Sequence, residues 1–223
     1  MEKLKPVKYF EDNGYIKIEN FITPSESFFL YNYIKLMAIK LNWFEENFTE
    51  LSNDIYDNHG TFNDPQAPGD YSKYGDPIFD TLLSLKLKEV EYFTGLNLLS
   101  NYSYHRLYTT NTELEKHIDR FSCEISTTLC LGYDVSNIDA KKYPDYNWPM
   151  FIKEKNGKEL PVHMKPGDMI IYRGCELEHW REPFLGLNHA QVFLHYNEIK
   201  NGENILFDGR PALGLPSSYK VEK

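Results

Sequence analysis

Apolar and polar residues follow two different spacings along the first part of this chain, and each spacing predicts one kind of secondary structure. Residues 14–21 alternate between apolar and polar positions, as in a short strand whose successive side chains point to opposite faces. Residues 24–41 carry apolar residues at helical spacing. The helix is expected to begin here because Thr23 is a favourable N-cap, Pro24 suits the first turn and Glu26 completes a capping box.

A second helix is predicted from Asp76-Pro77 to about Phe93, because leucines, a valine and a phenylalanine form one apolar side at helical spacing. The segment between the two helices, residues 53–77, is rich in Asn, Asp, Gly, Pro and Tyr. Such a composition is typical of turns, so we interpret this segment as a long ordered loop or lid.

From Leu98 onward the pattern changes to short β-rich runs separated by turn residues such as Asn156-Gly157. Helices first and strands afterwards predict a mainly β fold, a barrel supported by N-terminal helices. No internal repeat or linker divides the chain, so we expect a single domain over residues 1–223. Its expected parts are helical support and lid (1–96), barrel core (97–200) and a C-terminal extension (201–223).

The composition narrows the range of partners. The formal net charge is −9, which argues against a duplex-binding surface, so no nucleic acid partner is expected. No run approaches the ~18 apolar residues of a membrane span, so no membrane contact is expected either. The three cysteines form no C-x-x-C pair, which argues against a disulfide scaffold or a C-x-x-C zinc site. With no basic-plus-apolar signal at the N-terminus, the expected location is cytoplasmic.

The candidate chemistry lies in an H-x-D pair formed by His117 and Asp119. Side chains two residues apart on a strand point to the same face, so this imidazole and this carboxylate converge. A second histidine from another strand, His179, completes a set of two histidines and one carboxylate. Such a set holds Fe(II) on one face and leaves the opposite positions open. Two other histidines, His163 and His189, are weaker candidates for the distal ligand.

Three segments resemble the Fe(II)/2-oxoglutarate-dependent oxygenases, specifically their prolyl-4-hydroxylase-like branch. Residues 108–119 resemble the Y-x-x-G-x-x-x-x-x-H-x-D stretch of that family, with Asn111 in place of the usual glycine. Residues 166–172 resemble the P-G-D turn and strand that precede the distal histidine, and residues 179–186 resemble H-x-x-x-P-V-x-x-G. Asn tolerates a positive φ better than most residues, so the exchange at position 111 is mild.

The resemblance implies the fold, the cofactors and the reaction. The implied fold is a double-stranded β-helix, or jelly roll. The implied cofactors are Fe(II), 2-oxoglutarate as cosubstrate and O₂, with ascorbate as a supporting reductant. The implied reaction is hydroxylation of an aliphatic C–H bond with release of succinate and CO₂. A prolyl-like peptide or a small amino-acid-like molecule is the implied substrate, whereas the sequence does not determine the oligomeric state.

The resemblance also implies a 2-oxoglutarate site. Tyr108 matches the family position whose hydroxyl reaches the cosubstrate. His189 occupies the position where the family has a Lys or Arg for the far carboxylate, and Gln191 lies on the same strand face. Because imidazole is only a partial cation near neutral pH, Arg181 or Arg106 is the alternative source of positive charge.

Two other functions remain open at this stage. His189 stands where the family has a cation, and this difference is compatible with a non-catalytic jelly roll that binds a ligand or 2-oxoglutarate. The same metal triad also occurs in cupin-like metalloenzymes that do not use 2-oxoglutarate. Those enzymes usually add a third histidine ligand, so the pattern favours the oxygenase.

Overall fold

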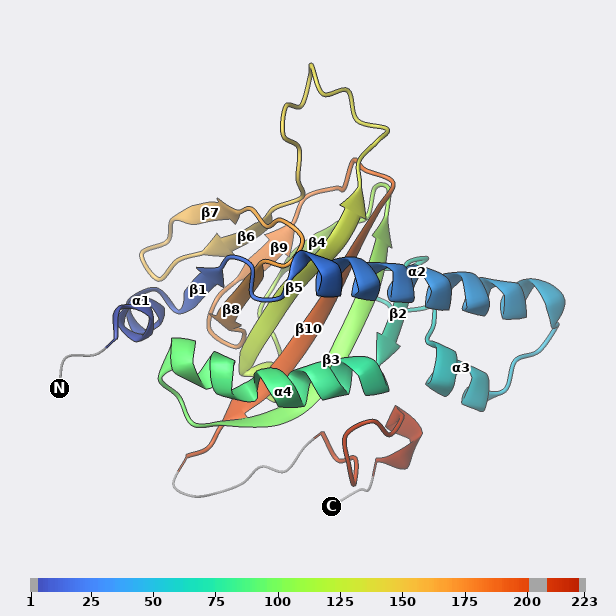
Figure 1. Cartoon of the computed structure of the whole chain (residues 1–223), viewed down its shortest axis with the longest axis horizontal. Coiled ribbons are helices and arrows are strands. Elements are labelled where there is room, and N and C mark those ends of the chain that lie inside the picture. Colours follow the sequence, from blue (N-terminus) through green and yellow to red (C-terminus); the bar gives the residue numbers. More distant parts are fainter. Residues whose placement is uncertain (1–3, 201–207, 221–223) are drawn as a thin grey trace.

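The structure is a computed structural model that describes residues 4–200 and 208–220. Within these residues, ten strands form two antiparallel sheets, which confirms the predicted mainly β fold (Figure 1). In order across the larger sheet, the strands are β1 (Tyr15–Ile18), β8 (Met169–Arg173), β5 (Ile125–Asp134), β10 (Asn188–Glu198), β3 (Leu98–Thr109) and β2 (Tyr71–Tyr74). The smaller sheet contains β4 (Leu114–His117), β9 (His179–Arg181), β6 (Met150–Lys153) and β7 (Glu159–Val162).

Two long helices, α2 (Pro24–Asn47) and α4 (Pro77–Thr94), lie across the outer face of the larger sheet (Figure 1). Their apolar sides form one core with the outward side chains of β5 and β10, as predicted. Two shorter helices, α1 (Lys5–Asn13) and α3 (Asn53–His59), flank them. Along the described parts of the chain, no helix combines the length and the apolar character that a membrane span requires.

The start of α2 follows the sequence closely. The Thr23 hydroxyl accepts a hydrogen bond from the Glu26 backbone N–H at 3.2 Å, and the Glu26 carboxylate accepts one from the Thr23 N–H at 2.7 Å. The end of α2 lies beyond the predicted Leu41, at Asn47. This extension packs an aromatic cluster against α3, with the Phe44 ring stacked 5.2 Å from that of His59. Contacts between elements therefore stabilise the last turns.

The expected loop over residues 53–77 contains two regular elements, so that interpretation was only partly correct. It begins with α3 and later contributes β2, which pairs with the edge of β3 in the register Ser72↔Arg106. A short helix and an edge strand lack a strong sequence pattern, because neighbouring elements supply most of their stabilisation. The prediction also missed α1, which ends at Gly14 in a left-handed conformation.

The alternation of β10 places its two faces in different environments. Ala190, Val192 and Leu194 point into the core beneath the helices. Phe193 and His195 point the opposite way and line a cavity inside the barrel. The fold therefore turns a polar strand face toward the interior of the barrel, where a ligand can satisfy it.

One buried histidine outside that cavity makes stability depend on pH. The His105 ring lies between Tyr71 and Phe79, and within the described residues neither of its nitrogens has a hydrogen-bond partner. Burial lowers the pKa of His105 from 6.5 to about 3. Between these two pH values the unfolded chain binds a proton at His105 that the folded chain does not. The free energy of unfolding therefore decreases as the pH falls.

We expect that in the His105→Phe variant the unfolded chain no longer binds this extra proton. Between pH 6.5 and about 3, its free energy of unfolding should then depend less steeply on pH than that of the wild type, by about 1.4 kcal/mol per pH unit. Urea unfolding at several pH values measures the slope. The exposed His163 provides the control, and His163→Asn should keep the wild-type slope. Equal slopes for His105→Phe and the wild type would contradict this account.

Candidate metal centre

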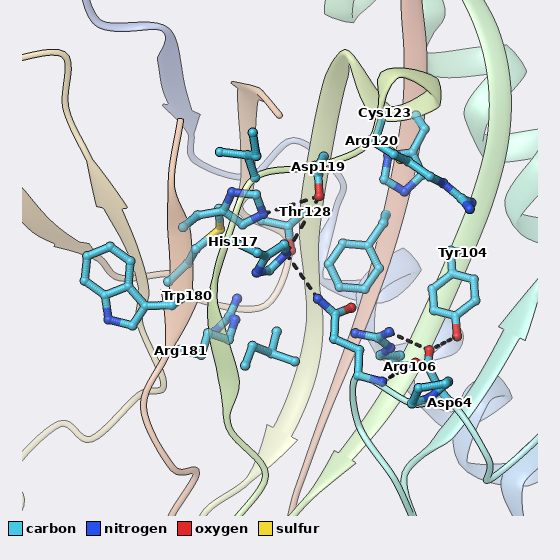
Figure 2. Close-up of a pocket in the computed structure, with 18 of the residues that line it drawn as sticks. Asp64, Tyr104, Arg106, His117, Asp119, Arg120, Cys123, Thr128, Trp180 and Arg181 are labelled. Atoms are coloured by element: carbon cyan, nitrogen blue, oxygen red, sulfur yellow. Dashed lines mark hydrogen bonds and ion pairs between the residues drawn. The ribbon is translucent and has the colours of Figure 1, made fainter. Parts of the chain in front are cut away.

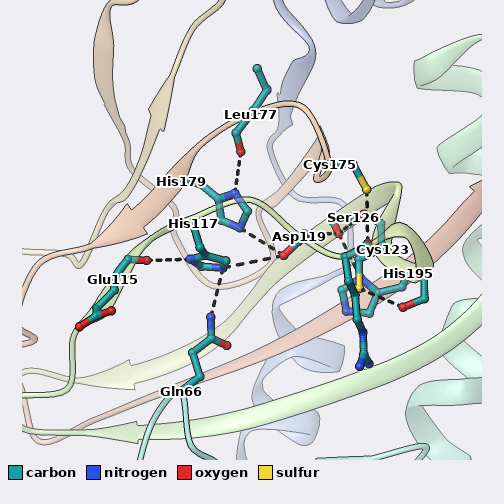
Figure 3. A network of polar contacts seen from close by, with 12 residues as sticks. Gln66, Glu115, His117, Asp119, Cys123, Ser126, Cys175, Leu177, His179 and His195 are labelled. Carbon is teal, nitrogen blue, oxygen red and sulfur yellow. Dashed lines mark hydrogen bonds and ion pairs between the residues drawn. The ribbon is translucent and has the colours of Figure 1, made fainter.

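Pairing between two short strands of the smaller sheet brings His117, Asp119 and His179 together. His117 ends β4 and lies directly opposite His179 on β9, with ring centres 4.3 Å apart. Asp119 Oδ1 lies 3.8 Å from His117 Nε2 and 3.5 Å from His179 Nε2. One potential ligand atom from each residue lies within 4.8 Å of the others, so the three side chains can surround one metal ion (Figure 3).

The weaker candidates for the distal ligand lie elsewhere. His163 is exposed, and its Nδ1 lies 2.6 Å from the Asn147 amide oxygen. His189 is buried inside the barrel against Tyr133.

Backbone carbonyls orient both ligand imidazoles. His117 Nδ1 lies 2.7 Å from the carbonyl oxygen of Glu115, and His179 Nδ1 lies 2.9 Å from that of Leu177. A carbonyl oxygen only accepts, so each Nδ1 must carry the hydrogen. In the neutral ring this leaves the lone pair on Nε2, the atom that faces Asp119. Such carbonyl partners are typical of metal-binding histidines.

A hydrogen bond from Ser126 orients the Asp119 carboxylate. Ser126 Oγ donates a hydrogen bond to Asp119 Oδ2 at 2.7 Å, which leaves Oδ1 directed at the two imidazoles (Figure 3). Burial acts to raise the pKa of Asp119, but His179, His195 and Ser126 outweigh it and lower this pKa to about 2. A Cβ on Gly174 would lie 2.4 Å from Asp119 Oδ2 and 2.4 Å from the Cys123 carbonyl oxygen, so only glycine fits beside this carboxylate.

The three residues open into a cavity of about 580 Å³. Figure 2 shows Trp180 and Arg181 on one side of His117 and Asp119, and Arg120 and Tyr104 on the other. The cavity thus has an Arg181 side and an Arg120 side, with the candidate ligands between them.

Several buried polar atoms inside the barrel lack hydrogen-bond partners among the described residues. They are Arg181 Nη2, Thr128 Oγ1, His189 Nδ1, and both side-chain amide atoms of Gln191. A buried polar atom without a hydrogen bond is destabilising, so such a group of atoms indicates a polar ligand. Arg181 and Thr128 line the cavity directly. The donors present fit a small dicarboxylate such as 2-oxoglutarate, because a guanidinium and a hydroxyl both donate to carboxylate oxygens.

His189 does not serve as the positive charge that its position in the sequence led us to consider. Burial, together with the charge of Arg181, lowers the pKa of His189 well below its ordinary value, so the imidazole is neutral. The cation beside it is Arg181, which is 3% exposed and lies over the Trp148 ring at 4.6 Å. Burial lowers the pKa of Arg181 as well, yet a guanidinium keeps its proton in proteins.

The other alternative cation, Arg106, already has a carboxylate partner. Its Nη2 lies 2.5 Å from Asp64 Oδ2, and Asp64 also accepts a hydrogen bond from the Tyr104 hydroxyl (Figure 2). Tyr108 is fully buried, and its hydroxyl lies 3.5 Å from Arg106 Nη1. Arg181 is therefore better suited than Arg106 to bind an anionic ligand.

Sequence reasoning missed several residues of this site. Asp64 and Gln66 reach it from the segment taken as a lid, and Gln66 Nε2 lies 3.1 Å from His117 Nε2. Ser126 and Thr128 come from β5, two residues apart on the same face. Alternation would have paired these two polar residues, but a serine and a threonine in a strand are too common to indicate a site.

No protein-family model and no curated protein matches the sequence. Solved structures do match the fold. Prolyl-4-hydroxylase from Pseudomonas putida aligns with a TM-score of 0.61 and 15% identity, over 86% of this chain and 96% of that one. EctD from S. alaskensis aligns with a TM-score of 0.61 and 17% identity, over 97% and 84%. HygX from Streptomyces hygroscopicus, solved with nickel and 2-oxoglutarate bound, aligns with a TM-score of 0.56 and 12% identity, over 88% of both chains.

The chain has the jelly-roll fold of Fe(II)/2-oxoglutarate-dependent oxygenases. This confirms the fold that the three sequence segments implied. At these identities the likeness concerns the fold, and the chemistry depends on the site itself.

The hydrogen bond from Ser126 to Asp119 leads to a testable prediction. Ser126→Ala should weaken Mn(II) binding by roughly 10- to 100-fold, the usual effect of losing a partner that orients a metal ligand. Manganese titration followed by electron paramagnetic resonance measures this. Ser122→Ala, which removes a nearby hydroxyl without a bond to Asp119, should bind like the wild type. If Ser126→Ala also kept wild-type affinity, the orienting role of Ser126 would be wrong.

Proposed function

We propose that this protein is an Fe(II)- and 2-oxoglutarate-dependent dioxygenase that hydroxylates an aliphatic C–H bond of a small amino-acid-like or peptidyl substrate. The observation that carries the proposal is the convergence of His117 Nε2, His179 Nε2 and Asp119 Oδ1 at one wall of a cavity in this fold. Two neutral imidazoles and one carboxylate suit Fe(II) and leave positions open for further ligands. Together, bound Fe(II) and 2-oxoglutarate supply oxidative decarboxylation coupled to hydroxylation.

The residues of the chain position these groups. Ser126 and the two backbone carbonyls direct the ligand atoms at one point. Arg181 is proposed to bind the far carboxylate of 2-oxoglutarate, with the Thr128 hydroxyl and the Gln191 amide as further partners. Because Arg181 lies in a buried, aromatic setting, its attraction for a carboxylate is screened less than it would be in water.

The buried arginine also bears on the two alternative functions. A non-catalytic module was kept open because His189 replaces the expected cation. Arg181 supplies a cation in the same part of the barrel, so that exchange no longer argues against 2-oxoglutarate. The unsatisfied nitrogen of Arg181 favours an enzyme with an anionic cosubstrate over a cupin-like enzyme that uses the metal without one.

Turnover of 2-oxoglutarate tests the reaction. With Fe(II), ascorbate and O₂, the purified protein should form succinate slowly alone and faster with a suitable substrate. Chelation of the metal should stop the reaction, and Asp119→Ala should lose it because a metal ligand is missing. Succinate is measured by chromatography. If the wild type forms no more succinate than Asp119→Ala across a broad substrate panel, the proposed dioxygenase function is wrong.

Exchange of Arg181 tests the cosubstrate site. Arg181→Gln should raise the KM for 2-oxoglutarate by roughly 10- to 100-fold, the value of a charge-assisted hydrogen bond, while Mn(II) still binds. His189→Ala should raise it less, because the imidazole is neutral. Arg173→Gln, outside the cavity, is the control for loss of one positive charge. A larger effect of His189→Ala than of Arg181→Gln would assign the carboxylate to His189 instead.

A further inference from the structure

On the Arg120 side of the cavity, a guanidinium lies beside a tyrosine and a cysteine instead of a carboxylate. Three arginines line the cavity, Arg106, Arg120 and Arg181, together with two aspartates, Asp64 and Asp119. Asp64 pairs with Arg106, and Asp119 faces the two histidines. The proposed function assigns Arg181 to 2-oxoglutarate. Arg120 is then the arginine of the cavity wall for which the described residues provide no carboxylate partner.

Arg120 is oriented by its neighbours although it is exposed at the mouth. Its guanidinium lies 5.5 Å from the centre of the Tyr102 ring, and Nη2 donates a hydrogen bond to the Tyr102 hydroxyl at 2.9 Å. Tyr102 in turn stacks on Tyr74 at 4.8 Å and contacts Cys123 Sγ at 2.9 Å. Glu124, the acidic residue that follows Arg120 in the sequence, pairs with Lys200. A guanidinium fixed on an aromatic face is prepared to bind a ligand, since it loses little freedom on binding.

A second cation lies on the same pair of tyrosines. Lys220 Nζ lies 4.4 Å from the centre of the Tyr74 ring. Burial lowers the pKa of Lys220; Asp208 acts to raise it, and Arg120 and Arg210 act to lower it further. Since the protein as a whole carries a net charge of −9, two cations over stacked tyrosine rings are not a consequence of composition. Such a local field attracts anions into the cavity.

The segment that carries Asp64 and Gln66 limits the size of the ligand. The Asp64 carboxylate accepts hydrogen bonds from Arg106 and Tyr104. At the end of the same segment, the Asp70 carboxylate accepts hydrogen bonds from Thr109 and Thr112. Gln66 lies between these two carboxylates in the sequence, and its side chain contacts His117. This segment is therefore anchored over the metal centre on both sides of Gln66, and the cavity behind it has a volume of about 580 Å³. That space suits a small molecule.

We propose that the substrate is a small molecule with a carboxylate or phosphate group, which Arg120 binds while the carbon to be oxidised faces His117 and Asp119. The proposal rests on the proposed function for the role of Arg181 and of the metal centre. Lys220 adds attraction for the same anionic group, and the Tyr74 and Tyr102 rings form the wall on which the substrate lies.

Matched pairs of compounds test the charge requirement. Free amino acids are compared with their amides, and phosphate monoesters with the parent alcohols, as stimulants of succinate formation by the protein with Fe(II) and 2-oxoglutarate. The charged member of a pair should have a KM at least about tenfold lower, as for a hydrogen bond to a charged group. The two series distinguish a carboxylate from a phosphate. Calorimetry with Mn(II), 2-oxoglutarate and no O₂ measures the same preference without turnover.

Variants of Arg120 test the residue. Arg120→Gln should raise the KM for the charged compound roughly 10- to 100-fold and leave that of its neutral analogue unchanged. Arg120→Lys should recover part of the preference. Lys88→Gln, which removes an exposed charge on α4, should behave as the wild type. Circular dichroism checks that each variant is folded.

Failure of this proposal differs from failure of the proposed function. Succinate formation without any preference for charged compounds would overturn the anionic substrate and leave the dioxygenase intact. Absence of succinate with every compound would overturn the dioxygenase, and the calorimetric comparison would still decide whether Arg120 selects anions. A preference for charged compounds that Arg120→Gln keeps would overturn the role of Arg120.

Discussion

The antiparallel pairing of β4 with β9 is the contact on which the candidate site depends. It sets His117 opposite His179, although the two residues are far apart in sequence. Asp119 follows just after β4, where the backbone of Gly174 accepts its N–H at 2.8 Å. A slip of one residue in either strand would turn an imidazole away from the cavity, because side chains alternate between faces. The larger sheet and its helices hold this register in place.

The interior of the barrel combines stability with the capacity to bind. One face of β10 joins the apolar core beneath α2 and α4, so burial of that face stabilises the fold. The other face carries His189, Gln191 and His195 inward, together with Thr128 from β5. Buried polar atoms without partners destabilise a folded chain, and a ligand that supplies those partners recovers the loss. The unpaired polar atoms in the barrel thus lower the stability of the fold without a ligand, and the same atoms allow the barrel to bind one.

Charge is distributed unevenly around the same cavity. Asp119 faces the two candidate histidine ligands, whereas Asp64 balances the charge of Arg106. Arg181 and Arg120 lie on opposite sides of the candidate metal ligands (Figure 2). A metal centre between two unmatched guanidinium groups favours two anionic ligands at once, one on each side. The proposed cosubstrate and the proposed substrate class correspond to these two positions.

The sequence by itself determined the helices over residues 24–41 and 77–93, the β-rich region after them and the three candidate ligands, since periodicity and short motifs are local properties. The three-dimensional structure decided which positive charge faces the interior of the barrel. His189 and Arg181 were both candidates, and only burial together with proximity shows that the histidine is neutral. Tertiary contacts likewise made α3 and β2 regular and brought Asp64 to Arg106. Burial, register and charge pairing arise between distant segments, so one chain read in order does not reveal them.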